Sequence, residues 1–159
     1  MQKENKYLIC GFSLIALYYL YFRFVWFNTS KASKHLAHIS EDLKALCQRY
    51  NYPFVAVVGA IIMQESSGNP NIDGASGEIG LMQIMPNTFN ALDKIYGFRF
   101  GFSDLYNPRL NMVVGIHLLK YLREKGLSIK NQIRAFNVGE DLKPTDKAQI
   151  YLNNVLKWI

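Results

Sequence analysis

Cysteine is scarce in this chain: Cys10 and Cys47 are the two cysteines among 159 residues. Cys10 lies in an apolar leader and Cys47 in a helical pattern, so we expect no pairing and no disulfide framework. Cys47 falls on the same helix face as Leu43 and Leu46, as a small core residue does. Zinc-ligand spacings are missing as well, and His117 on an apolar face has no ligand partner. We therefore expect neither a metal nor an organic cofactor.

Acidic residues are in the minority, with 12 Asp and Glu against 18 Lys and Arg and a formal net charge of +6. The resulting pI near 9.3 suits a polyanionic partner, which includes nucleic acid, anionic lipid and a bacterial cell wall with acidic stem peptides. Long Lys/Arg runs are absent, however, so nucleic acid is not an expected partner.

Alternating strand patterns with tight turns, internal repeats and low-complexity tracts are also absent. Apolar residues instead recur at helical spacing, and half of the chain is hydrophobic. We therefore expect one mainly α-helical domain after the leader. Caps and first-turn prolines place the helix starts at Ser40, Pro53, Asn87, Asn107, Ser128 and Thr145.

A long apolar run stands near the start of the chain, from Tyr7 to Phe27, with Arg23 as its one charge. About 20 apolar residues span a bilayer, so residues 1–28 are predicted to be a single transmembrane anchor. A cleaved signal peptide is the competing interpretation, with Ser30-Lys31-Ala32 as a small-x-small site. Residues 29–38 then form a polar tether to a domain at 39–159. Basic residues flank both ends of the run and do not set its orientation.

The segment that indicates chemistry runs from Gln64 to Pro86, QESSGNPNIDGASGEIGLMQIMP. Phe54 to Met63, just before it, carries no charge, so a helix made of it is expected to be buried. That helix would hold Glu65 at its end in an apolar setting. Because burial opposes ionisation, such a carboxyl keeps its proton toward neutral pH, as a general acid of glycoside chemistry must.

Several ordered motifs accompany this acid and together resemble the soluble-lytic-transglycosylase-like family of lytic transglycosylases. They are Glu65-Ser66, Asn69-Pro70, Gly77, Gly80-Leu81-Met82-Gln83-Ile84-Met85-Pro86, Arg134-Ala135-Phe136-Asn137-Val138-Gly139 and Tyr151. The resemblance covers roughly residues 40 to 157. It implies a mainly α, lysozyme-like α-helical domain, here preceded by the N-terminal transmembrane helix.

The resemblance also implies an activity: a peptidoglycan lytic transglycosylase with Glu65 as the catalytic residue. Glu65 protonates the β-1,4 glycosidic oxygen between N-acetylmuramic acid and N-acetylglucosamine. It then acts as base toward the C6 hydroxyl, which closes a 1,6-anhydro ring. A single carboxyl suffices because the attacking oxygen belongs to the substrate.

Substrate-binding residues follow from the same motifs. Gln83 and Asn137 offer amide groups for N-acetyl and hydroxyl groups, whereas Met85, Phe136 and Tyr151 offer apolar surface. For Met82, Met85 and the aromatic residues, packing in the core is an equally open interpretation.

Three departures from the family pattern stand out. Gly74 occupies the position of a serine near the acid, so Ser76 or backbone would supply that hydrogen bond. Phe136 replaces a tyrosine, and Lys147-Ala148 replaces a Glu-Thr pair.

Two other functions stay open on the sequence. A hydrolytic muramidase on the same fold needs a second carboxylate, for which Asp73 and Glu78 are the nearby candidates. A non-catalytic peptidoglycan-binding subunit of an envelope-spanning secretion machine is the other. The substrate implies an inner-membrane, single-pass protein with its domain in the periplasm, or a protein secreted there. A secretion or conjugation apparatus is a possible partner.

Overall fold

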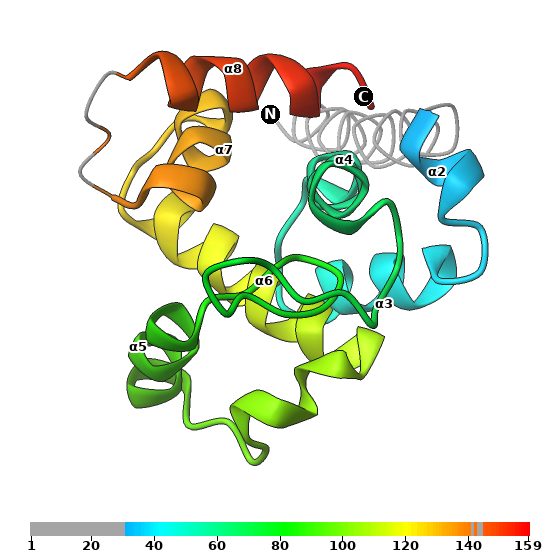
Figure 1. Ribbon diagram of the computed structural model, residues 1–159, viewed down its shortest axis with the longest axis vertical. Helices are drawn as coiled ribbons and strands as arrows, with labels where there is room; N and C mark the ends of the chain where they lie inside the picture. The colour runs from blue at the N-terminus through cyan, green and yellow to red at the C-terminus, as the bar shows by residue number, and fades with distance from the viewer. Residues whose placement is uncertain (1–30, 141, 143–144) are drawn as a thin grey trace, which may run out of the picture.

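The computed structural model describes residues 31–140, 142 and 145–159 (Figure 1). The predicted anchor over residues 1–28 lies outside these residues. Within them, no helix combines the length and apolar character needed to cross a bilayer.

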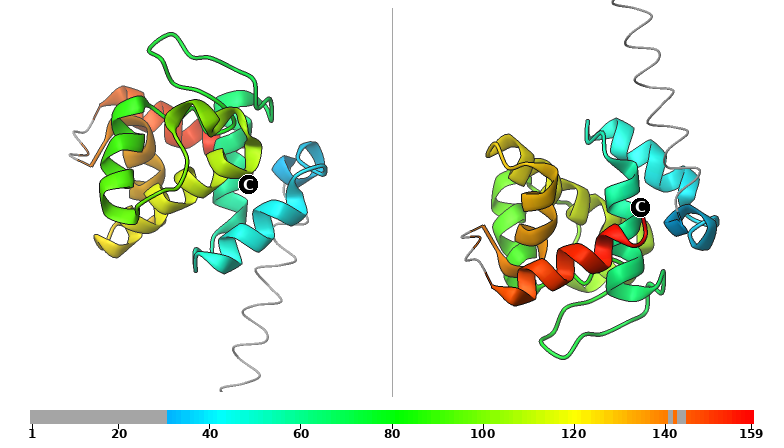
Figure 2. Two further views of the ribbon diagram at one scale, coloured as in Figure 1. Left: turned by 90° about the horizontal axis from the view of Figure 1, so that it is seen from below. Right: turned by 90° about the horizontal axis from the view of Figure 1, so that it is seen from above.

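The described part is mainly α-helical, as predicted. Its helices are α2 (Lys31–His35), α3 (Ser40–Arg49), α4 (Val55–Ser66), α5 (Pro86–Tyr96), the 3-10 helix η1 (Phe102–Tyr106), α6 (Pro108–Glu124), α7 (Ile129–Val138) and α8 (Asp146–Leu156). Side-chain caps at Asn107, Ser128 and Thr145 confirm three of the predicted helix starts. The segment between α4 and α5 extends as a long loop from the helical body (Figure 2).

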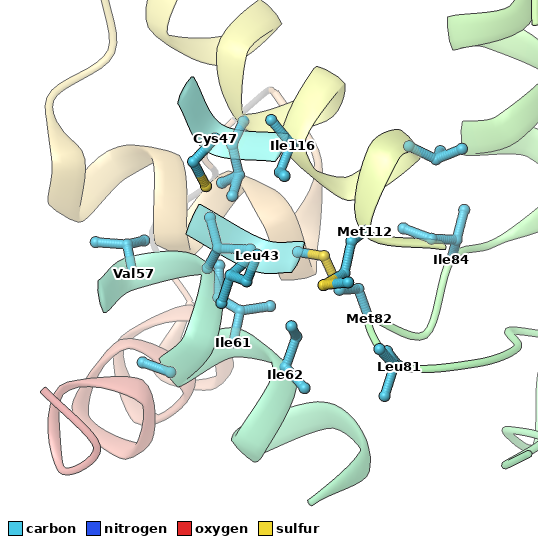
Figure 3. Packing of buried hydrophobic residues seen from close by; sticks show 14 of the residues in the cluster. Leu43, Cys47, Val57, Ile61, Ile62, Leu81, Met82, Ile84, Met112 and Ile116 are labelled. Carbon is cyan, nitrogen blue, oxygen red and sulfur yellow. The ribbon is translucent and has the colours of Figure 1, made fainter. Parts of the chain in front are cut away.

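Helix α4 is the buried centre of the domain. Every residue from Ala56 to Met63 is buried, and α4 packs against α2, α3 and α8. Because this stretch has no polar side chain, no face of the helix favours water, and neighbouring elements cover it all round. Figure 3 shows Ile61 and Ile62 of α4 packed among side chains of α3, α6 and the loop before α5. Cys47 is buried there too, as expected of a small core residue.

Residues 31–38 differ from the predicted tether, because they form α2 and a turn that belong to the core. Ala32 and Leu36 are fully buried, and the Ala32 N–H donates to the Trp158 carbonyl at 3.1 Å. Together with Ile39, these residues form an apolar stripe at spacings of four and three. This stripe was not recognised in the sequence because polar residues lie between its members. The folded domain therefore begins earlier than the sequence predicted.

Helix α8 packs one side against the core. Tyr151 and Val155 are buried, whereas Ile150 is 59% exposed.

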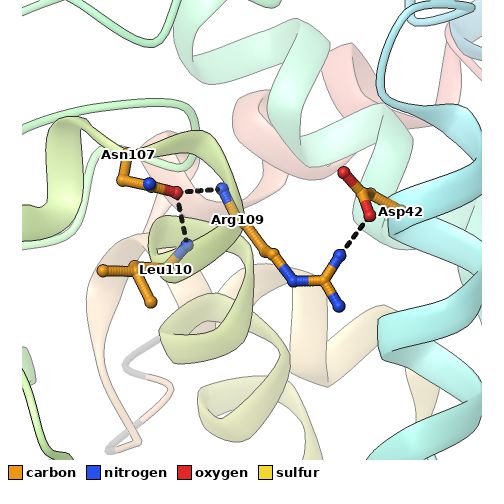
Figure 4. A network of polar contacts seen from close by, with 4 residues as sticks. All are labelled: Asp42, Asn107, Arg109 and Leu110. Atoms are coloured by element: carbon orange, nitrogen blue, oxygen red, sulfur yellow. Dashed lines mark hydrogen bonds and ion pairs between the residues drawn. The ribbon is translucent and has the colours of Figure 1, made fainter.

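The N-terminal end of helix α6 carries a side-chain cap and an ion pair to α3 (Figure 4). The Asn107 side chain accepts hydrogen bonds from the backbone N–H groups of Arg109 and Leu110, at 2.9 and 3.3 Å. The Arg109 guanidinium forms an ion pair with Asp42 of α3. This pair is half exposed, so the cap and the core packing contribute more to stability than the ion pair does.

Asn111, one turn into α6, ties the long loop to the helical body. Its side chain is fully buried. The side-chain oxygen accepts from the Met82 N–H at 2.8 Å, and the amide nitrogen donates to the carbonyls of Ile79 and Leu105, each at 2.9 Å. Three backbone groups in the interior are thus satisfied by one side chain.

We expect Asn111→Ala to lower the free energy of unfolding by about 3 kcal/mol, because it leaves three buried backbone groups without partners. Urea denaturation of the full chain measures the change. Asp42→Asn, which breaks the half-exposed ion pair, is the control, with an expected loss below about 1 kcal/mol. Equal losses in the two variants would contradict the role given to Asn111.

Candidate active site

Glu65 is the acidic side chain that the buried helix α4 carries at its C-terminal end. It is half-buried. The helix ends just after it, where Ser67 adopts the left-handed conformation (φ 53°) and its N–H bonds the Met63 carbonyl. The Tyr151 hydroxyl of α8 donates a hydrogen bond to Glu65 Oε1 at 2.5 Å. Two predicted site residues 86 positions apart are thereby brought together.

Burial is the largest influence on the ionisation of Glu65 and raises the pKa of its carboxyl above the ordinary value of 4.5. The Tyr151 hydrogen bond acts in the opposite direction, because it stabilises the carboxylate. The negative charge of Glu78 raises the pKa further. Burial and the adjacent acid also raise the pKa of Tyr151 well above its ordinary value, so its hydroxyl stays a donor. The net result is an acid that holds its proton to higher pH than an ordinary glutamate.

The other C-terminal site residues lie on α7, which packs against the α8 helix that carries Tyr151. Phe136 of α7 is half-buried against the core. The side-chain oxygen of the neighbouring Asn137 is buried and has no hydrogen-bond partner among the described residues. An unsatisfied buried acceptor costs about 1–3 kcal/mol, so this oxygen is suited to a donor from a bound molecule.

Gln83 has a structural task that its motif did not reveal. Its side-chain nitrogen donates to the carbonyls of Ile72 and Gly80, both at 3.1 Å, and its backbone has a positive φ of 46°. The amide hydrogens predicted for substrate therefore hold the loop together, and the side-chain oxygen is left as the group that can bind.

The two methionines of the GLMQIMP motif lie in different environments. Met82 is fully buried, and its sulfur fills the space beside Gly115, where a Cβ would lie 2.1 Å from it. Met85 is 37% exposed just before α5. Of the two interpretations left open by the sequence, Met82 belongs to the core, whereas Met85 presents apolar surface to solvent.

Ser76 does not take the place of the missing serine at position 74. It is exposed, and no hydrogen bond of the described residues joins it to Glu65. Its backbone N–H instead donates to Glu78 Oε2 at 3.0 Å. The half-buried Glu78 side chain lies where a side chain at position 74 would be, since a Cβ on Gly74 would sit 2.1 Å from it.

The loop carries one contact that no sequence motif indicated. The Tyr106 hydroxyl of η1 donates to Asp73, so this exposed carboxylate is engaged in holding the loop.

His117 is buried as expected, with its ring between Tyr50 and Tyr96 at 4.4 Å from each and its Nδ1 at 2.7 Å from the Val113 carbonyl.

No cluster of three metal-ligating side chains occurs in the part of the chain that the structure describes. A cavity of about 420 Å³ opens beside α7 and α8, and no predicted site residue lines it. Its lining residues are Asn131, Arg134, Leu142, Thr145, Asp146, Ala148 and Gln149.

We expect Glu65→Gln to make the folded chain more stable than the unmodified chain at neutral pH. The unfolded chain ionises Glu65 near 4.5, whereas the folded chain does so at higher pH. Stability from the protonated form is thus fully present below 4.5 and is lost as pH rises through the folded pKa. Glutamine cannot ionise but still accepts from Tyr151.

Urea denaturation at a series of pH values from about 3 to about 8 measures this difference. Glu140→Gln is a matched control, because Glu140 accepts a hydrogen bond from the Tyr121 hydroxyl at 3.0 Å but lies exposed. A stability gap between Glu65→Gln and the unmodified chain that does not grow with pH would contradict the electrostatics described for Glu65.

Comparison with solved structures supports the fold. The lytic transglycosylase Slt of Pseudomonas aeruginosa, solved as an inactive mutant, superposes with a TM-score of 0.68 at 22% identity, covering 77% of this chain and 23% of that chain. The 70-kDa soluble lytic transglycosylase of Escherichia coli has a TM-score of 0.55 at 26% identity, covering 73% and 19% of the two chains. The predicted lysozyme-like helical domain is thereby confirmed.

Three curated proteins are similar to this chain in amino-acid sequence. Membrane-bound lytic murein transglycosylase E of Buchnera aphidicola subsp. Baizongia pistaciae is 43% identical over 81 residues, and its counterpart in subsp. Acyrthosiphon pisum is 36% identical over 81 residues. They cover 47% and 48% of this chain. A transglycosylase of Enterobacteria phage PRD1 is 30% identical over 99 residues, 62% of this chain. The chain spans 34% to 37% of the length of these relatives.

The family model named Transglycosylase SLT domain matches residues 43–154. This range contains both partners of the Glu65–Tyr151 hydrogen bond and the loop that Asn111 and Gln83 hold. Because the match covers well over half of the sequence, the chain belongs to the transglycosylase SLT family.

Proposed function

We propose that this chain is a peptidoglycan lytic transglycosylase that cleaves the β-1,4 bond between N-acetylmuramic acid and N-acetylglucosamine and forms 1,6-anhydro-N-acetylmuramic acid. The observation that carries the proposal is the half-buried carboxyl of Glu65, whose pKa is raised by burial and which is hydrogen-bonded to Tyr151. The membership of the SLT family and the names of the relatives support the substrate class.

Glu65 performs both proton transfers in the proposed reaction. As an acid it gives its proton to the glycosidic oxygen while the bond from that oxygen to C1 breaks. As a carboxylate it then takes the proton of the C6 hydroxyl, whose oxygen forms the new bond to C1. Glu65 ends protonated as it began, and no water is consumed. Because the C6 hydroxyl is part of the same sugar, proximity lowers the barrier by several kcal/mol, on the order of 7 in favourable cases.

Tyr151 supports the second transfer. Its hydroxyl donates to Oε1 of Glu65, so the acidic proton is carried by the other carboxyl oxygen. When that proton leaves, the Tyr151 hydrogen bond becomes charge-assisted and stabilises the carboxylate. Tyr151 is thus a positioning residue for Glu65.

Four further residues are proposed to contact the glycan. The unpartnered oxygen of Asn137 accepts a hydrogen bond from an N-acetyl N–H group. The Phe136 ring and the exposed Met85 side chain pack against sugar faces. Gln83 takes part through its side-chain oxygen, because its nitrogen is engaged by the loop. Ser76 has no observed contact that supports a role in binding.

The cellular setting is proposed from the sequence and the relatives. Residues 1–28 are proposed to anchor the chain in the inner membrane, and the Buchnera relatives are named membrane-bound. The domain then faces peptidoglycan in the periplasm. A role beside a secretion or conjugation apparatus is compatible with this placement.

We expect Glu65→Gln to lower kcat/KM on purified peptidoglycan by about a hundredfold or more, because glutamine cannot donate the proton. Glu140→Gln should retain full activity, because that exposed acid has the same tyrosine contact but lies outside the site. Mass spectrometry of the muropeptides is the readout for the reaction. The anhydro product is lighter by one water than the hydrolytic product.

The outcome of that experiment separates the candidate functions. Reducing-end muropeptides from the unmodified chain would replace the transglycosylase by a hydrolytic muramidase. Retention of the biological role by Glu65→Gln, with no turnover in the unmodified chain, would favour a non-catalytic wall-binding subunit.

Tyr151→Phe keeps the ring but removes the hydroxyl that lowers the pKa of Glu65. The basic limb of the pH profile of kcat/KM should therefore shift to higher pH, with activity reduced roughly 10- to 100-fold by loss of a hydrogen bond to a charged group. Tyr121→Phe, which loses the equivalent bond to Glu140, is the control and should leave the profile in place. A shift to lower pH in Tyr151→Phe would contradict the assignment.

A further inference from the structure

The cavity of about 420 Å³ beside α7 and α8 is separate from the site that holds Glu65. The two helices pack against each other (Figure 1). Arg134 of α7 lines the cavity and lies two residues before Phe136. Gln149 of α8 lines it too and lies two residues before Tyr151. Because positions two apart differ by about 200° around a helix axis, the cavity opens away from the side on which Tyr151 meets Glu65.

The Arg134 guanidinium in this cavity is held in place by neutral groups. Its Nη1 donates to Asn131 Oδ1 at 2.9 Å, and its Nη2 donates to Gln149 Oε1 at 2.6 Å. Gln149 is fixed in turn, because its amide nitrogen donates to Asn153 Oδ1 at 2.8 Å. These bonds leave further N–H donors of the guanidinium for another acceptor. A planar fork of donors fixed in this way favours a carboxylate.

An acid lines the same cavity without pairing with this arginine. Within the part of the chain that the structure describes, the ion pairs join other side chains, and neither Arg134 nor Asp146 is in one. Arg134 is half-buried, whereas Asp146 is exposed in the first turn of α8. A simple anion would be attracted by the arginine and repelled by the aspartate. A ligand with both a carboxylate and an ammonium group matches both charges.

The other lining residues suit the uncharged part of such a ligand. Leu142 is half-buried and Ala148 is buried, so the two side chains give the cavity an apolar wall for a short carbon chain. Asn131 and Thr145 add polar groups. The volume of about 420 Å³ is in the range of small-ligand sites. An end of amino-acid size therefore fits in volume as well as in charge.

We propose that this cavity binds the zwitterionic end of an amino acid or peptide, with Arg134 binding the carboxylate and Asp146 the ammonium group. A cell-wall stem peptide that contains a diamino acid carries such an end, and so does the free diamino acid. The inference goes beyond the proposed function, because the cavity contains no residue placed in the cleavage reaction. With a stem peptide as ligand, the chain holds the peptide part of the wall separately from the glycan.

The test is calorimetric titration of the full chain, purified in mild detergent, with an N-acetylated stem tripeptide that ends in meso-diaminopimelate and carries no sugar. We expect Arg134→Gln to raise the Kd about tenfold or more, because charge-assisted hydrogen bonds to the carboxylate are lost. Lys147→Gln is the matched control. It removes a positive charge from an exposed position of α8 that does not line the cavity, so the Kd should be unchanged.

Asp146→Asn tests the second charge. Its Kd should rise about threefold, since an exposed charge pair contributes less than a half-buried one. Glu140→Gln, which removes an exposed acid outside the cavity, is its control and should leave the Kd unchanged. Thermal unfolding of each variant verifies that the fold is kept.

A modified peptide tests the carboxylate contact without any change to the protein. Amidation of the carboxylate beside the free ammonium group should weaken binding to the unmodified chain about tenfold. In Arg134→Gln the same amidation should cause little further loss, because the two changes remove one interaction.

The outcomes decide both the chemistry and the source of the ligand. The proposal is overturned if neither the tripeptide nor free diaminopimelate binds, if Arg134→Gln binds as the unmodified chain does, or if Lys147→Gln loses as much affinity. Tighter binding of the tripeptide than of free diaminopimelate supports a stem peptide as the ligand, whereas equal binding supports the free amino acid. Because the tripeptide has no glycosidic bond, failure of the proposed function would appear in the muropeptide assay and not in these titrations.

Discussion

The burial of one carboxyl group at the end of an apolar helix is the constraint on which the rest of this site depends. Helix α4 is enclosed from Ala56 to Met63 because this stretch has no polar side chain, and its last turn carries the half-buried Glu65. A carboxyl in that position is costly to ionise. The surrounding structure offsets part of that cost with one hydrogen bond from Tyr151 and does not offer a basic partner among the groups that act on Glu65. The balance leaves an acid that can also become a base.

The long loop between α4 and α5 is held by amide side chains that bind backbone. Asn111 satisfies three buried backbone groups and Gln83 satisfies two carbonyls. A segment with so little regular structure would otherwise leave polar groups unpaired. The same bonds hold Ile72, Ile79 and Gly80, the residues on either side of Asp73 and Glu78.

Local patterns predicted much of the fold. The uncharged run before Glu65 predicted a buried helix, and the caps at Asn107, Ser128 and Thr145 predicted helix starts, because these features act over a few residues. The packing of α2 against the core was not predicted, because three apolar residues among polar ones resemble the composition of a polar tether.

Site residues were predictable in part. The motifs placed Glu65 and Tyr151 in one site, but they did not predict the hydrogen bond between them, the engagement of Gln83 by carbonyls or the position of Glu78 over Gly74. The contacts of Gln83 and the position of Glu78 depend on how the loop between α4 and α5 closes in space. For Glu78, the only signal in the sequence was a glycine at position 74. A missing side chain indicates that space is needed without indicating which neighbour fills it.

The central claim is that Glu65 keeps its proton above the pH at which an ordinary glutamate loses it. Carbon NMR of glutamate-labelled full chain measures this directly, with Glu65→Gln identifying the Glu65 carboxyl resonance. The account predicts a titration midpoint for that resonance above 4.5. A midpoint at or below that value would contradict it.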